Sequence, residues 1–259
     1  MIHTILVVTP MNITATKTGT ENILPMRALF LHEGNFQFIH NSYHARNWAD
    51  TYLFSVNDEI AGYGCTCGIE DRNIRNTVFE YYILPSFRRM SLEVFIALLH
   101  NSGARFIESQ SNDVLLTQML YHFAKNINTG AILFEDNITP AILCPGVTFR
   151  CKNAGDKIFE HKAEPEGDYL LEREGEIVAT GGFLLHYNLP YADLYMEVHE
   201  DSRRKGYGSF LIQEVKKACY LAGRIPAARC GLTNTASKLT LIKAGFKICG
   251  YMLRGQVKI

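Results

Sequence analysis

A strand that passes through a short basic loop straight into a helix is the feature that most constrains this chain. Residues 195–209 read YMEVHEDSRRKGYGS, and their loop contains an Arg-x-x-Gly-x-Gly pattern that begins at Arg203. After the loop, residues 211–222 place apolar side chains at helical spacing, and Gly223 ends the pattern. The segment predicts a strand, a glycine loop and an amphipathic helix in direct succession.

The predicted loop has the chemistry of an anion-binding site. The first amides of a helix have no partners within the helix, and the helix dipole places positive charge there. Gly206 and Gly208 lack a Cβ atom, so the backbone can approach a bound group closely. No carboxylate occurs from residue 203 to residue 213, and a phosphate or pyrophosphate is the expected ligand. The positive side chains at the mouth of the loop are those of Arg203, Arg204 and Lys205.

Two common phosphate-binding motifs do not fit this loop. A nucleotide P-loop requires Gly-Lys-Ser/Thr, which does not follow Gly208. The dinucleotide fingerprint requires a third glycine, and residues 209–212 contain none. The remaining alternative is a tight basic turn that binds no ligand.

The order of motifs in this region resembles that of the GNAT family, the Gcn5-related N-acetyltransferases. The pattern from Arg203 to Gly208, between a strand and a helix, is similar to the family's pyrophosphate loop. In the family a strand, an Asn and a short helix that ends in Gly-Phe come next, and this chain has Asn234 and then Gly245-Phe246 in that order. The resemblance covers about residues 165–259.

The resemblance implies a site for acetyl-coenzyme A. The loop amides, with Arg203 and Lys205, would hold the pyrophosphate, and Asn234 stands where the family uses a side chain on the pantetheine arm. Asn234 is also a favourable N-cap for the helix predicted over residues 235–244, and the two roles are compatible. The residues assigned to the cofactor in this way are Val198, Arg203, Arg204, Lys205, Gly206, Tyr207, Gly208, Ser209, Asn234 and Ser237.

Glu197 is the candidate general base. An acceptor amine with a pKa around 10 must lose a proton before or during transfer, and a carboxylate that lines a cleft can accept it directly or through water. Alternation along the predicted strand puts Tyr195, Glu197 and His199 on one face. An exposed strand residue without a catalytic role is the alternative interpretation of Glu197.

The oxyanion and the leaving group are assigned from the resemblance. Backbone amides around Val198 would stabilise the oxyanion, because two strands splay apart there in the family. Many members carry a Tyr seven residues after the Asn, but this chain has Leu241 at that position. Tyr251, and secondly Tyr195, are the substitute candidates for the acid. A thiol with a pKa near 8.5 can also leave as the thiolate without help.

The first half of the chain repeats the order of the second. Residues 52–64 align without gaps to residues 169–181. Further along, Arg88, Gly103 and Asn112 fall on Arg203, Gly223 and Asn234, at nearly constant separations. Such spacing indicates a duplicated unit. The runner-up interpretation is one GNAT domain behind an unrelated N-terminal domain.

The predicted fold class is α/β (α+β), with two tandem GNAT-like domains. Each would be a mixed, mostly antiparallel sheet flanked by helices, with a degenerate domain at residues 1–140 and the acetyltransferase domain at residues 141–259. In the first half Ser91 and Glu93 replace the two glycines of the loop. A Cβ atom and a carboxylate there disfavour a pyrophosphate, so one cofactor site per chain is expected.

Composition limits the remaining possibilities. Lys+Arg and Asp+Glu both number 26, and this balance argues against nucleic-acid binding through bulk charge. Residues 1–10 lack a basic leader and are predicted to form a strand, and no apolar run is long enough to span a membrane. Seven cysteines and the scattered histidines suggest free thiols in the cytoplasm and no metal.

The function expected from these patterns is acetyl-CoA-dependent N-acetylation of a primary amine on an unidentified small molecule or peptide. The partners would be coenzyme A and that acceptor, with neither nucleic acid nor membrane involved. The alternative is an acyl-CoA-binding or regulatory module without catalysis, a possibility raised by Leu241 and by the altered first half.

Overall fold

The computed structural model describes residues 11–162 and 165–258. The strand expected at residues 1–10 lies outside this part of the chain. The elements of the first half are β1 (Ile13–Thr18), η1 (Thr20–Asn22), α1 (Leu24–Glu33), α2 (Asn41–Ala45), β2 (Ala49–Val56), β3 (Glu59–Cys67), β4 (Thr77–Ile83), η2 (Pro85–Met90), α3 (Ser91–Ser102), β5 (Phe106–Gln110), α4 (Val114–Phe123) and β6 (Ala124–Asp136). Those of the second half are β7 (Thr148–Cys151), β8 (Tyr169–Arg173), β9 (Glu176–Leu184), β10 (Tyr191–Val198), η3 (Glu200–Ser202), α5 (Tyr207–Leu221), β11 (Ile225–Gly231), α6 (Thr235–Lys243) and β12 (Phe246–Val257).

One twelve-stranded sheet runs through the described molecule. Its order is β1-β2-β3-β4-β5-β12-β6-β11-β10-β9-β8-β7, and most neighbouring strands are antiparallel. Helices flank the sheet, so the predicted α+β class is confirmed. None of the helices in the described ranges is long and apolar enough to cross a membrane.

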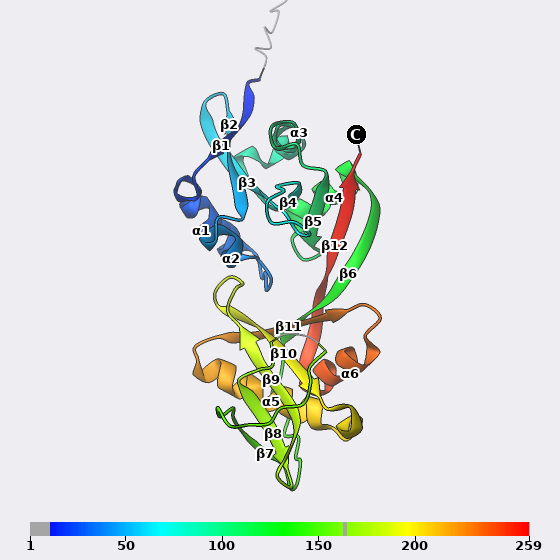
Figure 1. The fold of residues 1–259 in the computed structure, drawn as a ribbon. Coiled ribbons are helices and arrows are strands. Elements are labelled where there is room, and N and C mark those ends of the chain that lie inside the picture. The colour runs from blue at the N-terminus through cyan, green and yellow to red at the C-terminus, as the bar shows by residue number, and fades with distance from the viewer. Residues whose placement is uncertain (1–10, 163–164, 259) are drawn as a thin grey trace, which may run out of the picture.

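Two long strands, β6 and β12, are exchanged between the halves. They pair with each other from Phe246 to Val257, and Figure 1 shows them running from one half into the other. Residues 252–256 of β12 lie between β5 and β6, inside the first half. Residues 131–135 of β6 lie between β11 and β12, inside the second half. Each half is therefore completed by a strand that the other half supplies.

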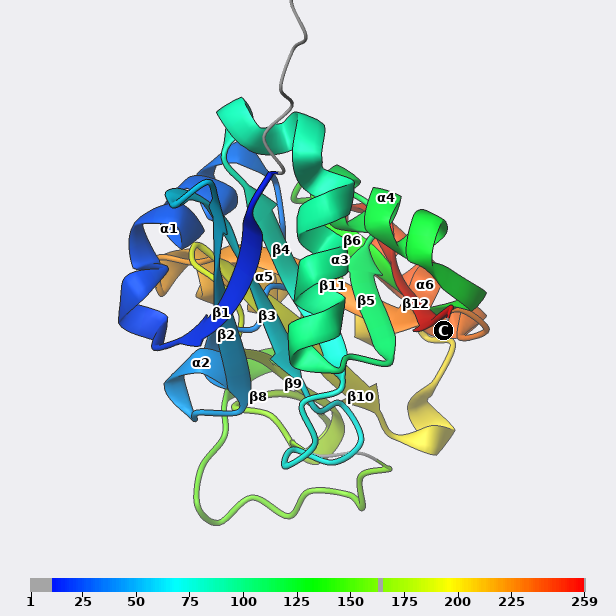
Figure 2. The ribbon, with the colours of Figure 1, turned by 90° about the horizontal axis from the view of Figure 1, so that it is seen from above.

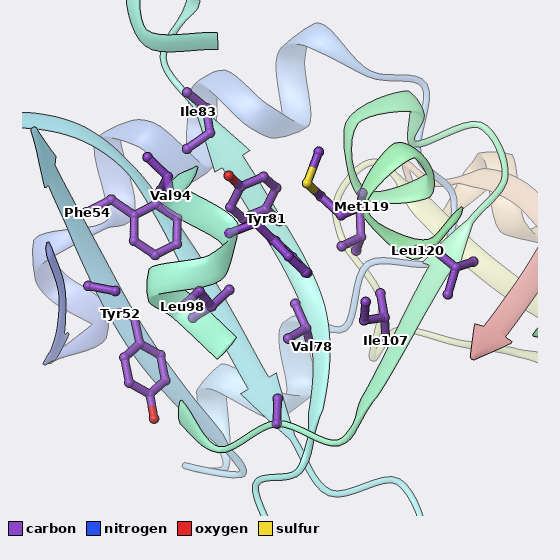
Figure 3. Close-up of a cluster of buried hydrophobic side chains, with 14 of the residues drawn as sticks. Tyr52, Phe54, Val78, Tyr81, Ile83, Val94, Leu98, Ile107, Met119 and Leu120 are labelled. Carbon is purple, nitrogen blue, oxygen red and sulfur yellow. The ribbon is translucent and has the colours of Figure 1, made fainter. Parts of the chain in front are cut away.

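Separate apolar cores cover the two faces of the sheet in the first half. Side chains of α3 and α4, including Val94, Leu98 and Leu120, pack on one face with Phe54 and Tyr81 (Figure 3). The other face carries a second core, to which α1 contributes. Figure 2 shows α3 and α1 on opposite sides of the strands β1 to β4. A third core joins α5 and α6 to the sheet of the second half.

The duplication predicted from the sequence recurs in backbone geometry. Arg88 and Arg203 each donate a hydrogen bond from Nε to the carbonyl of the last residue of the preceding strand, over 3.3 Å in both cases. Gly103 and Gly223 both follow a helix in the left-handed conformation, with φ of 65° and 71°. The N-cap equivalent to Asn234 is Asp113, so the predicted correspondence of Asn234 with Asn112 is off by one residue.

Candidate functional site

Two parallel strands of the second half diverge and leave a gap in the sheet. β10 and β11 pair only from Tyr191 to Leu194, opposite residues 225–228. Beyond this point β10 continues to Val198 beside β9, without a β11 partner in the described sheet. The gap opens toward the loop that precedes α5.

The peptide groups of β10 that point into the gap include that of Val198. The amide of His199 donates to the carbonyl of Val178 in β9, over 3.0 Å. Because peptide groups alternate in direction along a strand, the amides of Val198 and Met196 point away from β9, toward the diverging β11. These amides are available to a ligand in the gap.

Gly206 and Gly208 have different structural roles in the glycine loop. Gly206 is the N-cap of α5 with φ of 88°, a conformation that residues with a Cβ atom rarely adopt. A Cβ atom there would meet nothing within 4 Å among the described residues, so the requirement at Gly206 is conformational. A Cβ atom on Gly208 would lie 3.2 Å from Cγ2 of Thr240, so Gly208 allows α5 to approach α6 closely.

The loop residues divide into exposed cations and buried side chains. Arg203, Arg204 and Lys205 are exposed. Tyr207 is buried, and its hydroxyl accepts a 2.5 Å hydrogen bond from Arg173. Ser209 is also buried and donates to the carbonyl of Thr240 over 3.3 Å. Residues 207 and 209 can therefore contribute only backbone groups to a ligand at the start of α5.

Asn234 caps α6, as the sequence predicts. Its Oδ1 accepts a hydrogen bond from the amide of Ser237 over 3.0 Å. The cap lies directly after β11, on the side of the gap opposite the glycine loop. The two predicted parts of the cofactor site therefore flank the same opening.

Glu197 lies on the face of the sheet away from α5. Its carboxylate accepts the amide of Lys162 over 3.2 and 3.1 Å, one hydrogen bond to each oxygen. Met196 and Val198, its neighbours in the strand, pack against the α5 core. On the same face as Glu197, burial and nearby Asp168 raise the pKa of Tyr195 to about 12. The alternation predicted for this strand is confirmed.

The structure does not bring Tyr251 and Glu197 together. Tyr251 lies on β12, three strands from β10 in the sheet order. At a spacing of about 4.8 Å per strand, this separates them by roughly 14 Å across the sheet. Tyr251 lies opposite Ile132, which packs in the α5 core on the other face. Leu241 is also buried in that core.

The loop of the first half has a different construction. Met90 is the N-cap of α3, Ser91 begins the helix, and Glu93 lies in its first turn. Arg88 forms an ion pair with Glu33. A pocket of about 280 Å³ lies nearby, between the end of β4 and the start of α4. The two glycines of the second half are therefore replaced, and the arginine equivalent to Arg203 is held in an ion pair.

Two functional candidates on β10 and β11 have no local sequence signal. Asp193 and Arg229 form an ion pair, with 3.1 Å between Nε and Oδ2. Burial raises the pKa of the Asp193 carboxyl to about 6, although Arg229 opposes this effect. The one available clue was that Asp193 alternates onto the same strand face as Glu197.

A cluster of possible metal ligands in the first half is already neutralised by an arginine side chain. Atoms of His44, Cys65 and Glu80 lie within 4.8 Å of one another. Arg27 forms an ion pair with Glu80, with 3.0 Å between Nε and Oε2, and thereby supplies the positive charge. His40 and His44 stand four residues apart, a spacing typical of metal sites. The ring of His40 instead stacks on Tyr43, with 4.0 Å between ring centroids.

Comparisons with known proteins agree with this geometry. Residues 142–246 match the model of the acetyltransferase (GNAT) family, whereas no curated protein matches the chain. A GNAT-family acetyltransferase from Colwellia psychrerythraea has the same fold, with a TM-score of 0.72, 15% identity, and coverage of 95% of this chain and 100% of its own. A GCN5-related N-acetyltransferase from Sphaerobacter thermophilus is similar with a TM-score of 0.52 and 17% identity, over 81% of each chain. A tandem GNAT protein from the clavulanic acid biosynthesis pathway is similar with a TM-score of 0.54 and 9% identity, over 96% of this chain and 99% of its own.

Proposed function

We propose that this chain, which carries a GNAT-family domain at residues 142–246, transfers an acetyl group from acetyl-CoA to a primary amine. One observation carries the proposal: the gap between β10 and β11 opens onto the left-handed glycine loop at the N-terminus of α5. Unpaired strand amides, helix amides and exposed cations meet at this opening. No acidic residue lies in the first turn of α5 to compete with a pyrophosphate.

The residues of the loop fit coenzyme A through their backbone. The first amides of α5 would bind the pyrophosphate, with Arg203, Arg204 and Lys205 adding charge at its exposed side. Asn234 and Ser237 flank the other side of the gap, where the pantetheine arm would pass. When bound, acetyl-CoA supplies an activated thioester.

Glu197 would accept the proton that the amine loses. The amine nitrogen forms a bond to the thioester carbonyl carbon, and the carbon–sulfur bond breaks in the same exchange. The amide of Val198 would donate a hydrogen bond to the oxygen that becomes negative. Tyr251 lies on the far side of the sheet from Glu197, so the thiolate would leave unaided, or take a proton from solvent or from Tyr195, which lies on the same face as Glu197.

The first half is proposed to be a degenerate GNAT-like unit, with the boundary near residue 140. Glu93 and the Arg88–Glu33 ion pair remove the features that favour a pyrophosphate. Its role would be to cover the acceptor face of the second half. A cytoplasmic location is proposed because all seven cysteines are free thiols.

The experiment is transfer of a labelled acetyl group from acetyl-CoA to a panel of amines. The parent protein should form labelled products, and Gly206→Val should bind acetyl-CoA far more weakly because valine rarely adopts φ near 88°. Arg105→Gln, an exposed change remote from the loop, is the matched control. Unchanged calorimetric affinity in a folded Gly206→Val protein would contradict the proposed site. Tight binding without transfer to any amine would support the alternative, an acyl-CoA-binding module, to which the buried Leu241 points.

A further inference from the structure

Arg229 stands at the point where the gap in the sheet begins. Ala228 is the last residue of β11 that pairs with β10, and Arg229 follows it. Its side chain lies on the same face as Asp193 and Glu197, because it forms an ion pair with Asp193 and alternates with the core residues Ala228 and Cys230. The guanidinium is therefore on the face where the proposed base lies.

The guanidinium is held on one edge and free on the other. Its Nε donates to the nearly buried carboxyl of Asp193 over 3.1 Å. The rings of Tyr187 and Phe38 lie 5.3 and 6.0 Å from its carbon Cζ. Its terminal nitrogens form no hydrogen bond with any residue in the described ranges, and the side chain is 41% exposed. A guanidinium fixed in this way presents two parallel N–H donors to a ligand.

The first half of the chain supplies part of the aromatic surroundings of Arg229. Phe38 packs edge-on against Tyr187, with 5.1 Å between ring centroids. Asn188 fixes the surrounding loop, since it accepts the amide of Ile39 and donates to the carbonyl of Phe36, both over 2.9 Å. The aromatic surroundings of Arg229 are thus held by side-chain to backbone hydrogen bonds across the two halves.

Asp193 is the one carboxylate within ion-pair distance of Arg229 among the described residues. Burial raises the pKa of Asp193 to about 6 and also raises the pKa of Glu108, the other carboxyl nearby. Arg72 and Arg254 act on Glu108 as well and oppose its shift. Burial lowers the pKa of His40 to about 3, so this histidine adds no positive charge near pH 7. Arg229 is an exposed cation beside the gap, on the face of the sheet where Glu197 lies.

We propose that Arg229 binds a carboxylate of the acceptor, so that the acceptor is a small amine that also carries a carboxylate, as in an amino acid. The guanidinium of Arg229 is bonded to Asp193, and Glu197 lies four residues further along the same face of β10. Four residues correspond to about 13 Å of strand, which the free edge of the guanidinium, the acceptor and the Glu197 side chain would span together. One end of the acceptor would then bind Arg229 while its amine faces Glu197. This inference rests on the proposed function.

The kinetic test compares each proteinogenic L-amino acid with its own carboxamide as acceptor in acetyl transfer. The parent protein should prefer the acid through a lower KM. Arg229→Gln should raise KM for the acid by roughly ten-fold to a hundred-fold, because a charge-assisted pair is lost, and should change KM for the amide much less. Arg105→Gln is the matched control, because Arg105 is an exposed arginine directly before β5. It should leave the KM for the acid and the KM for the amide unchanged.

Two further measurements keep the inference separate from folding and from catalysis. The double variant Asp193→Asn/Arg229→Gln removes both charges and retains a hydrogen-bonding pair, so the buried carboxyl is not left without its partner. Calorimetric titration with the same acids and amides requires no turnover, and the parent should bind an acid more tightly than its amide. Equal affinity for acid and amide in the parent, or an equal loss of both in the double variant, would overturn the inference. Failure of all transfer with retained acid binding would instead contradict the proposed function alone.

Discussion

Replacing Leu253 with alanine tests the strand exchange. Leu253 is near the C-terminus, yet its side chain belongs to the apolar core of the first half that α3 and α4 cover. It is only 8% exposed, so its truncation creates a cavity that the neighbours fill only in part. We expect Leu253→Ala to destabilise the first half by about 2–5 kcal/mol.

The single tryptophan makes this effect measurable in one half. Trp48 is the only tryptophan of the chain, and it packs beside the α1 core of the first half. Its fluorescence during urea unfolding should therefore report the stability of that half. With an m value of about 2 kcal/mol per molar urea, in the middle of the usual range, the midpoint should fall by roughly 1–2.5 M.

Ile248→Ala is the matched control for this experiment. Ile248 lies in the same strand, in the part that pairs with β6 inside the second half, and is 38% exposed. Its truncation should change the Trp48 transition by about 0.5 kcal/mol or less. If Leu253→Ala leaves the Trp48 transition unchanged while the second half is destabilised, each half keeps its own last strand and the exchange is wrong.

Two further substitutions test the proposed base and the buried ion pair. Glu197→Gln should lower turnover strongly and leave acetyl-CoA affinity about unchanged, since Glu197 acts on the acceptor; a rate and pH profile equal to the parent's would rule out the assignment. Burial opposes the ionisation of Glu80, but Arg27 and His44 lower its pKa to about 2, so the carboxylate stabilises the fold above its ordinary pKa of 4.5 and loses this contribution as the pH falls toward 2. Glu80→Gln should cost about 3–5 kcal/mol near pH 7, because Arg27 is left buried without a counter-charge. The difference from the parent should shrink below pH 4.5 in urea titrations followed by Trp48, and a constant difference would refute this account of Glu80.

Local patterns in the sequence predicted the parts of the site that depend on local structure. The loop around Gly206, the helix after it and the cap at Asn234 follow from residue types at short spacing. Glu197 was placed on the correct strand face because side chains alternate along a strand. These features depend on neighbours within a few residues.

Features that depend on long-range pairing could not be predicted in this way. Residues 252–256 pair with β5. A local sequence pattern cannot identify a partner strand that is so distant in the sequence. The same limit hid the ion pair between Asp193 and Arg229, which lie on different strands. For the same reason the sequence could not show how far Tyr251 lies from Glu197, because the three-strand separation depends on the order of the strands in the sheet.

The most direct test of the central claim is calorimetric titration of the full chain with acetyl-CoA. The account predicts one molecule bound per chain, a weaker site in Arg203→Ala, and an unchanged site in Arg88→Ala, the equivalent change in the first half. Arg88 already forms an ion pair with Glu33, whereas Arg203 is exposed beside the glycine loop. Two molecules bound per chain, or a site lost in Arg88→Ala and retained in Arg203→Ala, would contradict the account.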